Sequence, residues 1–355
     1  MKNSVNVGII GVGGIARGAH IKGLKEVKEA NIIAICDIDE ERLNSVGEDL
    51  GILPEKRYVN YEELIMDGDV EAVEICTPNY LHVPMAVAAL KAGKHVNVEK
   101  PVSTDYASAA PLIAALQDID PEKQVAMTCF SYRFSPAVRY AKWIIDQGML
   151  GDIVNVKVEY LKDSAFMKGR KLEWRFIKEM AGTGVLGDLG AHLVDMTRLL
   201  VGEFSGVAAH TEIIVKERMK PDDSGMGKVE TDDFCSFIAR MENGATADFT
   251  ISRCAIGERN TIRYDIYGTK GLISFDLNYW DTLKVCVGEI DVNAGGMHTV
   301  TPPAEFKASQ EQTFIDAILG KKNEYFPSLY DAIACQKVLS AVQEADEKKV
   351  WVQIS

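Results

Sequence analysis

The sequence lacks a hydrophobic run long enough to cross a bilayer, and it lacks an excess of positive charge. A transmembrane helix needs about 20 consecutive apolar residues, whereas 47% hydrophobic and 26% charged residues are typical of a soluble globular protein. The formal net charge of -13 disfavours recognition of nucleic acid through the overall electrostatic field. We therefore expect no membrane and no nucleic-acid partner, and a small molecule as the substrate.

Regularly spaced cysteines are also absent. The seven cysteines are an odd number, and no two of them form a C-x-x-C pair. Disulfide frameworks and structural zinc sites usually show closely and regularly spaced cysteines. The sequence therefore predicts reduced thiols, a cytoplasmic location and no bound metal.

Glycine is concentrated near the start of the chain, directly after an apolar stretch at residues 5–10. Gly11, Gly13 and Ala16 fill the pattern G-x-G-x-x-G/A, which joins a strand to a helix and lets the backbone approach a pyrophosphate. The phosphates would lie at the N-terminus of that helix. We assign this part of a cofactor site to Gly11, Gly13, Gly14 and Ile15.

A second apolar run, at residues 31–36, ends at Asp37, 26 residues after Gly11. Dinucleotide-binding folds place a carboxylate here, where it accepts hydrogen bonds from the adenosine ribose and repels the 2'-phosphate of NADP. Asp37 therefore predicts NAD as the cofactor, with NADP less favoured. Arg42 could weaken this preference if its side chain turned toward a phosphate.

The first part of the chain alternates strands with helices, which predicts a parallel sheet covered by helices. With 355 residues in total we expect two domains, a Rossmann dinucleotide-binding domain at 1–130 and a second domain at 131–355. The strand at 71–76 runs into Thr77, Pro78 and Asn79, and ligands bind outside the carboxyl ends of such strands. We expect these three residues to contact the cofactor, although a plain strand-to-helix turn explains them equally well. His82 is a secondary candidate, since a single histidine in the first turn of a helix is more often structural.

A short strand at 94–98 ends in Glu99, Lys100 and Pro101. Neighbouring residues of a strand point in opposite directions, so Lys100 could reach a substrate while Glu99 serves the cofactor. The other interpretation of the two charges is a solvated turn.

From residue 151 onward the pattern changes to alternating polar and apolar residues, which predicts a mostly antiparallel sheet. Asn243 and Gly244 indicate a tight hairpin, and residues 216–230 are predicted to form a mobile loop. The last helix, expected at 329–345, could pack back on the first domain. If helices cover only one face of this sheet, the other face is free for a homodimer or homotetramer contact.

One predicted helix interrupts this sheet. Asp188 and His192 are four residues apart, so they would share one helical face, with Asp195 a turn further along. A carboxylate beside histidine can orient the ring and stabilise its protonated form, which suits acid/base catalysis. A structural hydrogen bond is the other interpretation.

The motifs in this order resemble those of the Gfo/Idh/MocA oxidoreductases, which include glucose-fructose oxidoreductase and inositol dehydrogenase. The resemblance covers nearly the whole chain and rests on the segments 11–16, 76–79, 99–101 and 184–195. It implies a Rossmann domain, a second domain with a large open sheet, and reversible oxidation of a secondary alcohol of a sugar, sugar acid or cyclitol.

The resemblance also implies roles for single residues. His192 would take the hydroxyl proton, Lys100 would bind the same oxygen, and Asp188 would balance the charges. Arg133, Tyr160 and Arg175 are expected on the substrate side. The basic cluster Lys168, Arg170, Lys171 and Arg175 would favour an anionic sugar if it faces the substrate, and is otherwise a solvated loop.

Two alternatives remain within the resemblance. Some relatives use the nicotinamide for transient oxidation during glycoside hydrolysis, and others have become regulators that bind dinucleotide and sugar without turnover. The presence of Lys100, Asp188 and His192 argues against a regulator.

Overall fold

The computed structural model describes residues 4–321 and 323–354, and the chain divides into two compact units. Unit 1 comprises the described residues up to Phe130 together with Ser309–Ile333, and unit 2 comprises Ser131–Ala308 and the described residues from Ala334 onward. Unit 1 thus includes Ser309–Ile333, a segment that the predicted boundaries placed in the second domain. No helix within the described ranges is long and apolar enough to cross a membrane.

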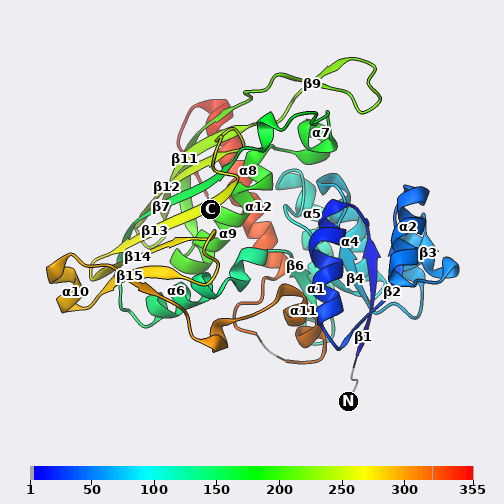
Figure 1. Ribbon diagram of the computed structural model, residues 1–355, viewed down its shortest axis with the longest axis horizontal. Coiled ribbons are helices and arrows are strands. Elements are labelled where there is room, and N and C mark those ends of the chain that lie inside the picture. Colours follow the sequence, from blue (N-terminus) through cyan, green and yellow to red (C-terminus); the bar gives the residue numbers. More distant parts are fainter. Residues whose placement is uncertain (1–3, 322, 355) are drawn as a thin grey trace. The chain divides into compact units, whose positions relative to one another are not determined.

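Unit 1 is built on a parallel six-stranded sheet with the order β3-β2-β1-β4-β5-β6 (Figure 1). This is the strand order of a dinucleotide-binding Rossmann fold. The strands are β1 (Val5–Ile10), β2 (Ala30–Cys36), β3 (Arg57–Tyr58), β4 (Ala72–Ile75), β5 (His95–Val98) and β6 (Ala126–Thr128). The predicted fold class of the first half is therefore confirmed.

The helices of unit 1 pack in pairs beside this sheet: α1 packs with α11, and α4 packs with both α3 and α5. Local signals set their ends, as in α2, where Asp39 caps the first turn and Gly51 adopts a left-handed conformation after the last. The helical segments are η1 (Ala16–His20), α1 (Ile21–Glu26), α2 (Glu40–Leu50), η2 (Pro54–Lys56), α3 (Tyr61–Met66), η3 (Asn79–Leu81), α4 (His82–Lys91), η4 (Ala107–Ala109), α5 (Ala110–Gln117) and α11 (Gln310–Ile318).

Unit 2 contains a nine-stranded sheet with the order β16-β15-β14-β13-β7-β12-β11-β8-β17. The described pairings are antiparallel except for β7 with β12, which confirms the predicted, mostly antiparallel sheet. The strands are β7 (Ile153–Lys162), β8 (Phe204–Glu212), β11 (Phe234–Met241), β12 (Thr246–Ser252), β13 (Asn260–Gly268), β14 (Gly271–Asp276), β15 (Leu283–Val287), β16 (His298–Val300) and β17 (Val352–Gln353). The predicted hairpin at Asn243 and Gly244 joins β11 to β12.

Helices cover one face of the sheet in unit 2. Strand residues alternate between buried and more exposed positions, and α8 and α9 pack against β7, β11 and β12 (Figure 1). The helical segments are η5 (Ser131–Phe134), α6 (Pro136–Asp146), η6 (Ser164–Phe166), η7 (Trp174–Phe176), α7 (Lys178–Ala181), α8 (Val185–Asp188), α9 (Gly190–Val201), α10 (Glu289–Ala294) and η8 (Ala304–Phe306); α12 (Leu329–Lys348) begins in unit 1 and continues in unit 2.

The segment 216–230 is not the irregular loop that its composition predicts. It contains a two-stranded antiparallel hairpin, β9 (Glu217–Met219) with β10 (Met226–Lys228), drawn in yellow-green in Figure 1. The amide of Leu172 donates to the carbonyl of Met219 at 2.8 Å. Partners remote in sequence therefore stabilise strands whose local sequence does not signal them.

Candidate active site

The glycine-rich turn has the geometry that a bound pyrophosphate requires. Gly11 has φ +86°, and a Cβ atom there would lie 2.8 Å from the carbonyl oxygen of Cys76, so a side chain is excluded. Cβ atoms at Gly13 and Gly14 would meet nothing within 4 Å, and Ile15 is 44% exposed. The turn is thus open to a ligand on the side where the helix begins, which fits a dinucleotide.

Asp37 lies directly after β2 and is held on several sides. Its carboxylate accepts from the amide of Val12 at 2.9 Å and from the amide of Asp39 at 3.0 Å. The guanidinium of Arg42 donates to both carboxylate oxygens, at 2.7 and 3.1 Å. Burial alone would raise the pKa of Asp37, but the hydrogen bonds from Arg42 and from the two amides lower it, so the group is an anion beside the glycine-rich turn.

The turn after β4 is tied to the turn after β5 by a buried histidine. The two ring nitrogens of His82 lie 2.8 Å from the carbonyl oxygens of Thr77 and Pro101. Burial lowers the pKa of His82. Asn79 is buried, and Pro78 is half-buried beside it. His82 therefore holds the backbone at Thr77, where the cofactor is expected to bind, close to the backbone at Pro101.

Glu99 and Lys100 occupy the carboxyl end of β5, as predicted. Glu99 is buried and accepts from the backbone amide of Lys100 at 3.1 Å, while Lys100 is half-buried. The other oxygen of Glu99 lies 2.8 Å from Nε2 of His20. His20 could not be predicted from the sequence, because its partners lie 54 and 79 residues further along the chain.

The helix predicted to carry Asp188 and His192 is divided in two. Helix α8 ends at Asp188, Leu189 has φ -106°, and α9 begins at Gly190. The prediction of one continuous helix through both residues is therefore wrong, and they lie instead on adjoining helices of unit 2. His192 is buried, Asp188 is half-buried, and the apolar residues Leu189, Leu193 and Met196 are buried.

Aromatic side chains surround His192. Its ring meets the ring of Tyr132 edge to face at 4.6 Å, and the hydroxyl groups of Tyr132 and Tyr160 are 2.9 Å apart. Tyr160 also donates to Oδ1 of Asn260 at 3.0 Å. Burial, together with Tyr132 and Asp188, raises the pKa of Tyr160 well above its ordinary value, so its hydroxyl keeps its proton. Tyr132 and Asn260 were not predicted from the sequence. They come close to Tyr160 only in the folded unit 2, where Tyr132 also contacts His192.

Two arginines expected on the substrate side have other contacts. Arg133 is 4% exposed and donates to both carboxylate oxygens of Asp195, with one distance of 2.8 Å. Arg175 lies over the ring of Trp174 at 4.4 Å and is partly exposed. The structure thus gives Arg133 a partner on α9 and leaves Arg175 at a surface.

The basic cluster at 168–175 is partly internal to unit 2. Arg170 packs on the ring of Phe176 at 4.8 Å, and Lys171 pairs with Asp223 at 2.9 Å. Two further arginines, Arg218 and Arg253, lie over the same Phe176 ring. These contacts join the cluster to the β9–β10 hairpin.

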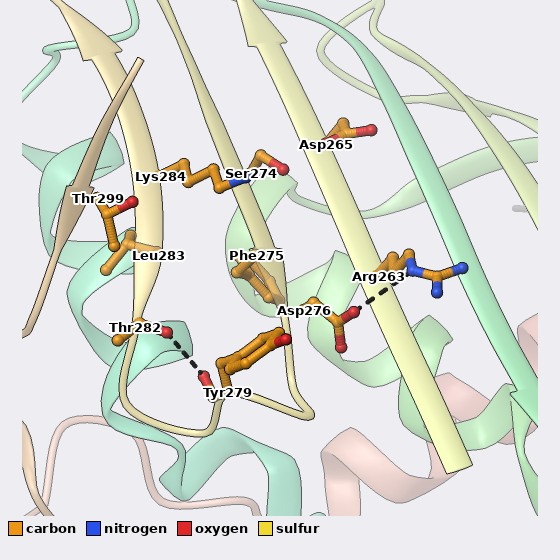
Figure 2. Close-up of a pocket in the computed structure, with 10 residues that line it drawn as sticks. All are labelled: Arg263, Asp265, Ser274, Phe275, Asp276, Tyr279, Thr282, Leu283, Lys284 and Thr299. Atoms are coloured by element: carbon orange, nitrogen blue, oxygen red, sulfur yellow. Dashed lines mark hydrogen bonds and ion pairs between the residues drawn. The ribbon is translucent and has the colours of Figure 1, made fainter. Parts of the chain in front are cut away.

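A cavity of about 290 Å³ lies elsewhere in unit 2, over β13, β14 and β15. Figure 2 shows Asp276 turned toward Arg263, with Lys284 and Ser274 on the neighbouring strands. Tyr264, between Arg263 and Asp265, points the opposite way and donates to the carbonyl of Leu193 in α9 at 2.8 Å. The cavity therefore lies on the face of the sheet opposite to the helices that carry Asp188 and His192.

Comparisons with known proteins match both parts of the chain. The profile of the oxidoreductase family with an NAD-binding Rossmann fold matches residues 5–125, and that of the GFO/IDH/MocA C-terminal domain matches residues 138–274. Levoglucosan dehydrogenase of Pseudarthrobacter phenanthrenivorans is 32% identical over 83% of each chain. Glucose-6-phosphate 3-dehydrogenase of Bacillus subtilis is 28% identical over 98% of each chain.

Solved structures agree with these matches over the whole length. A levoglucosan dehydrogenase in complex with NADH and levoglucosan superposes with a TM-score of 0.89, at 29% identity and covering 99% of each chain. Together with the glycine-rich turn, Asp37 and the motifs around Lys100 and His192, the matches show that this chain belongs to the Gfo/Idh/MocA family of oxidoreductases, with an N-terminal NAD-binding Rossmann domain.

Proposed function

We propose that this oxidoreductase is an NAD-dependent dehydrogenase that acts on a secondary alcohol of a sugar, sugar acid or cyclitol. The observation that carries the proposal is the presence, in one chain, of Lys100 at a carboxyl strand end of an NAD-binding domain and of Asp188 and His192 on the helices of unit 2. Relatives include enzymes named for levoglucosan, glucose 6-phosphate and myo-inositol, so their substrates belong to one chemical class.

The cofactor would be held by the residues of unit 1 described above. The amides of the glycine-rich turn would face the pyrophosphate, and Asp37 would accept hydrogen bonds from the adenosine ribose. Thr77, Pro78 and Asn79 would lie beside the nicotinamide end of the cofactor. Bound NAD supplies a two-electron acceptor for the hydride of the alcohol carbon. NAD is favoured over NADP because Asp37 is an anion.

The protein would move the proton and stabilise the charge. We assign to His192 the role of general base, which takes the proton of the substrate hydroxyl. Lys100 would donate a hydrogen bond to the same oxygen and stabilise negative charge on it, and Asp188 would balance the positive charge on these groups. Tyr132, whose ring lies against His192, restricts the orientation of the imidazole.

Substrate contacts are also proposed within unit 2. Tyr160 and Tyr132 offer hydroxyl groups close to His192, and the ring of Trp280 lies 6.1 Å from that of Tyr132. Aromatic rings of this kind bind the apolar faces of sugars while their hydroxyls bind polar groups. Arg175 would add a positive charge only for an acidic or phosphorylated substrate.

The assembly and location are part of this proposal. We expect a cytoplasmic homo-oligomer that uses the uncovered face of the sheet in unit 2. That face carries Ile238, which is 51% exposed, and Tyr267, which is 36% exposed, among charged side chains such as Arg263. The contact would therefore be largely polar, and not the apolar surface that a free sheet face suggests from sequence.

The test combines a substrate screen with single substitutions. Polyols, aldoses and uronates are offered with NAD or NADP, and the absorbance of the reduced nicotinamide is followed. With the substrate found, Lys100→Ala and His192→Ala should each lower kcat by about 10²- to 10⁴-fold, because general acid/base help is lost.

The same preparations should bind NADH with nearly normal affinity and melt near the wild-type temperature. The combined loss in the double variant should be smaller than the product of the single losses, since both residues act on one oxygen. A folded His192→Ala enzyme with near-normal turnover would refute the assignment, and release of sugar from a glycoside with catalytic NAD would instead identify a hydrolase.

A further inference from the structure

His20 is a buried histidine in unit 1 that the proposed chemistry does not use. It ends η1, the helical segment that follows the glycine-rich turn, and it is 1% exposed. Its Nδ1 lies 3.0 Å from Oε2 of Glu74, and its Nε2 lies 2.8 Å from Oε1 of Glu99. The ring therefore bridges two buried carboxyl groups, one on β4 and the other directly after the neighbouring strand β5.

A doubly protonated ring explains this geometry, because it offers a donor to each carboxyl group. A carboxylate only accepts hydrogen bonds, so a neutral imidazole would turn one bare nitrogen toward a carboxylate oxygen. Burial acts to lower the pKa of His20, yet interactions with the neighbouring Cys76 and Cys129 raise it well above its ordinary value. Burial similarly acts to raise the pKa of Glu99, and His20 lowers it. The pair is thus an imidazolium and a carboxylate.

The remaining groups around His20 fit the same charge pattern. Glu74 also accepts from Nδ2 of Asn97 at 2.9 Å. Glu311, on α11, has a raised pKa because of its burial and the nearby charge of Glu74. The imidazolium is consequently the cation that faces the acidic groups of Glu74 and Glu99.

One contact connects this cluster to Lys100, and a second buried histidine holds the residue on the other side of it. The second oxygen of Glu99 accepts from the backbone amide of Lys100 at 3.1 Å, so His20 fixes the residue before the lysine. On the other side, Nδ1 of His82 lies 2.8 Å from the carbonyl oxygen of Pro101. Each of the two residues next to Lys100 in the chain is thus held by its own buried histidine, Glu99 by His20 and Pro101 by His82.

A metal ion is the other chemistry that these residues suggest, because His20 lies close to Glu74 and Cys76 and also to Glu99 and Cys129. Ligands around zinc are each about 2.0–2.3 Å from the ion, which separates ligand atoms by more than the 2.8 and 3.0 Å found here. Burial also raises the pKa of the Cys76 thiol to about 11, which keeps it protonated. The geometry is that of direct hydrogen bonds.

We propose that His20 is a positioning residue that, through Glu99, orients Lys100 relative to the glycine-rich turn. This inference rests on the role of Lys100 in the proposed function. Because His20 belongs to the helical segment that follows the turn, the chain Glu74–His20–Glu99–Lys100 links the place where the pyrophosphate would bind to the residue that would bind the substrate oxygen. A misplaced catalytic group can cost about 10²-fold in rate, so the link has a measurable consequence.

The decisive experiment is a double-mutant cycle between His20→Gln and Lys100→Ala, with kcat measured on the substrate that the screen identifies. Glutamine cannot offer the two opposed charged donors of the imidazolium, so His20→Gln should lower kcat by about 10- to 100-fold. In the Lys100→Ala background the same substitution should cost less than about threefold, since the residue that it positions is gone. Glu99→Gln should lower kcat to a similar extent in each background. It replaces His20→Gln in the cycle if that variant does not fold.

The matched control is His95→Gln. His95 is the first residue of β5, whereas Lys100 follows the other end of that strand. The Nδ1 atom of His95 accepts from the amide of Val125 at 3.0 Å. We expect this variant to keep its turnover. Equal fold-losses for His20→Gln in the two backgrounds would overturn the positioning role, whereas unchanged turnover in Lys100→Ala alone would refute the proposed function of Lys100.

A second readout needs no substrate. Nitrogen chemical shifts of the imidazole rings distinguish imidazolium from neutral histidine, and the six histidines can be assigned by substitution. In the wild type, His20 should remain an imidazolium at pH 8, above the ordinary histidine pKa of about 6.5. In Glu99→Gln, the His20 ring should lose its proton at a lower pH than in the wild type. A neutral His20 ring at pH 7 in the wild type would overturn the proposal.

Discussion

Asp37 combines a structural task with the choice of cofactor. Its carboxylate connects the glycine-rich turn, through Val12, to the first turn of α2, through Asp39 and Arg42. The same two oxygens are the acceptors that the ribose hydroxyls of NAD would need. Arg42 donates to both of these oxygens, so its side chain is the group with which a ribose would share the carboxylate.

Substitution of these two residues tests the preference for NAD. Asp37→Ala should lower the ratio of kcat/KM with NAD to that with NADP by at least about tenfold, because acceptors are lost for NAD and repulsion is lost for NADP. Arg42→Ala is the matched control, and it should preserve the preference for NAD and weaken the use of NADP. Similar efficiency with both cofactors in the wild type, unaffected by Asp37→Ala, would contradict the role given to Asp37.

At the scale of elements, the pair Arg133–Asp195 fastens η5 to α9, the helix that carries His192. Both side chains are buried, and the guanidinium meets both carboxylate oxygens. Removal of one member of a buried pair leaves an uncompensated charge, which costs about 3–5 kcal/mol. The adjacent Tyr132, also on η5, contacts the His192 ring, so the pair supports the surroundings of the candidate base.

We therefore expect Arg133→Ala to lower the free energy of unfolding by about 3–5 kcal/mol, measured by urea denaturation. Arg175→Ala, at a partly exposed position, should change it by no more than about 0.5 kcal/mol. If Arg133→Ala were as stable as the wild type and showed only a higher KM, Arg133 would be a substrate ligand, as the family resemblance implied.

Among the described residues of unit 2, no helix covers the second face of the sheet. Its exposed residues form cross-strand charge pairs, such as Arg263 with Glu159 at 3.3 Å, and line the cavity in Figure 2. Ile238 lies on the same face of β11 and is half exposed. A partner with the same surface could meet this face through complementary charges arranged about a two-fold axis.

Sedimentation at micromolar concentration should accordingly show a dimer or tetramer. Ile238→Asp should shift the equilibrium toward monomer, because it buries a new unpaired charge in the contact, and high salt should weaken the contact through screening of the charge pairs. Ile256→Asp, at an exposed position outside the named strands, is the control and should not change the assembly. A wild-type monomer at these concentrations would exclude the proposed contact.

The features that were predicted correctly depend on neighbours in sequence. Residues 5–10 and the glycines after them specify a strand and a tight turn, because φ +86° at Gly11 is accessible to glycine and unfavourable for other residues. Asn243 and Gly244 specify the β11–β12 hairpin in the same way. Alternation of strands with helices predicts the parallel sheet of unit 1, and alternation of polar with apolar residues predicts the mostly antiparallel sheet of unit 2.

The features that the sequence did not reveal depend on partners far along the chain. Helices α8 and α9 are separate, and the carboxylate of Asp232 accepts from the amides of Gly184 and Leu186, at 2.6 and 2.9 Å, where α8 begins. Long-range contacts likewise order the β9–β10 hairpin and unite Arg133 with Asp195. The family resemblance, the glycine-rich turn and the candidate catalytic residues could thus be predicted from the sequence, since they depend on local patterns. Only the tertiary structure could bring His20, Glu74 and Glu99 together, because hydrogen bonds between buried charges require three separate segments to meet within about 3 Å.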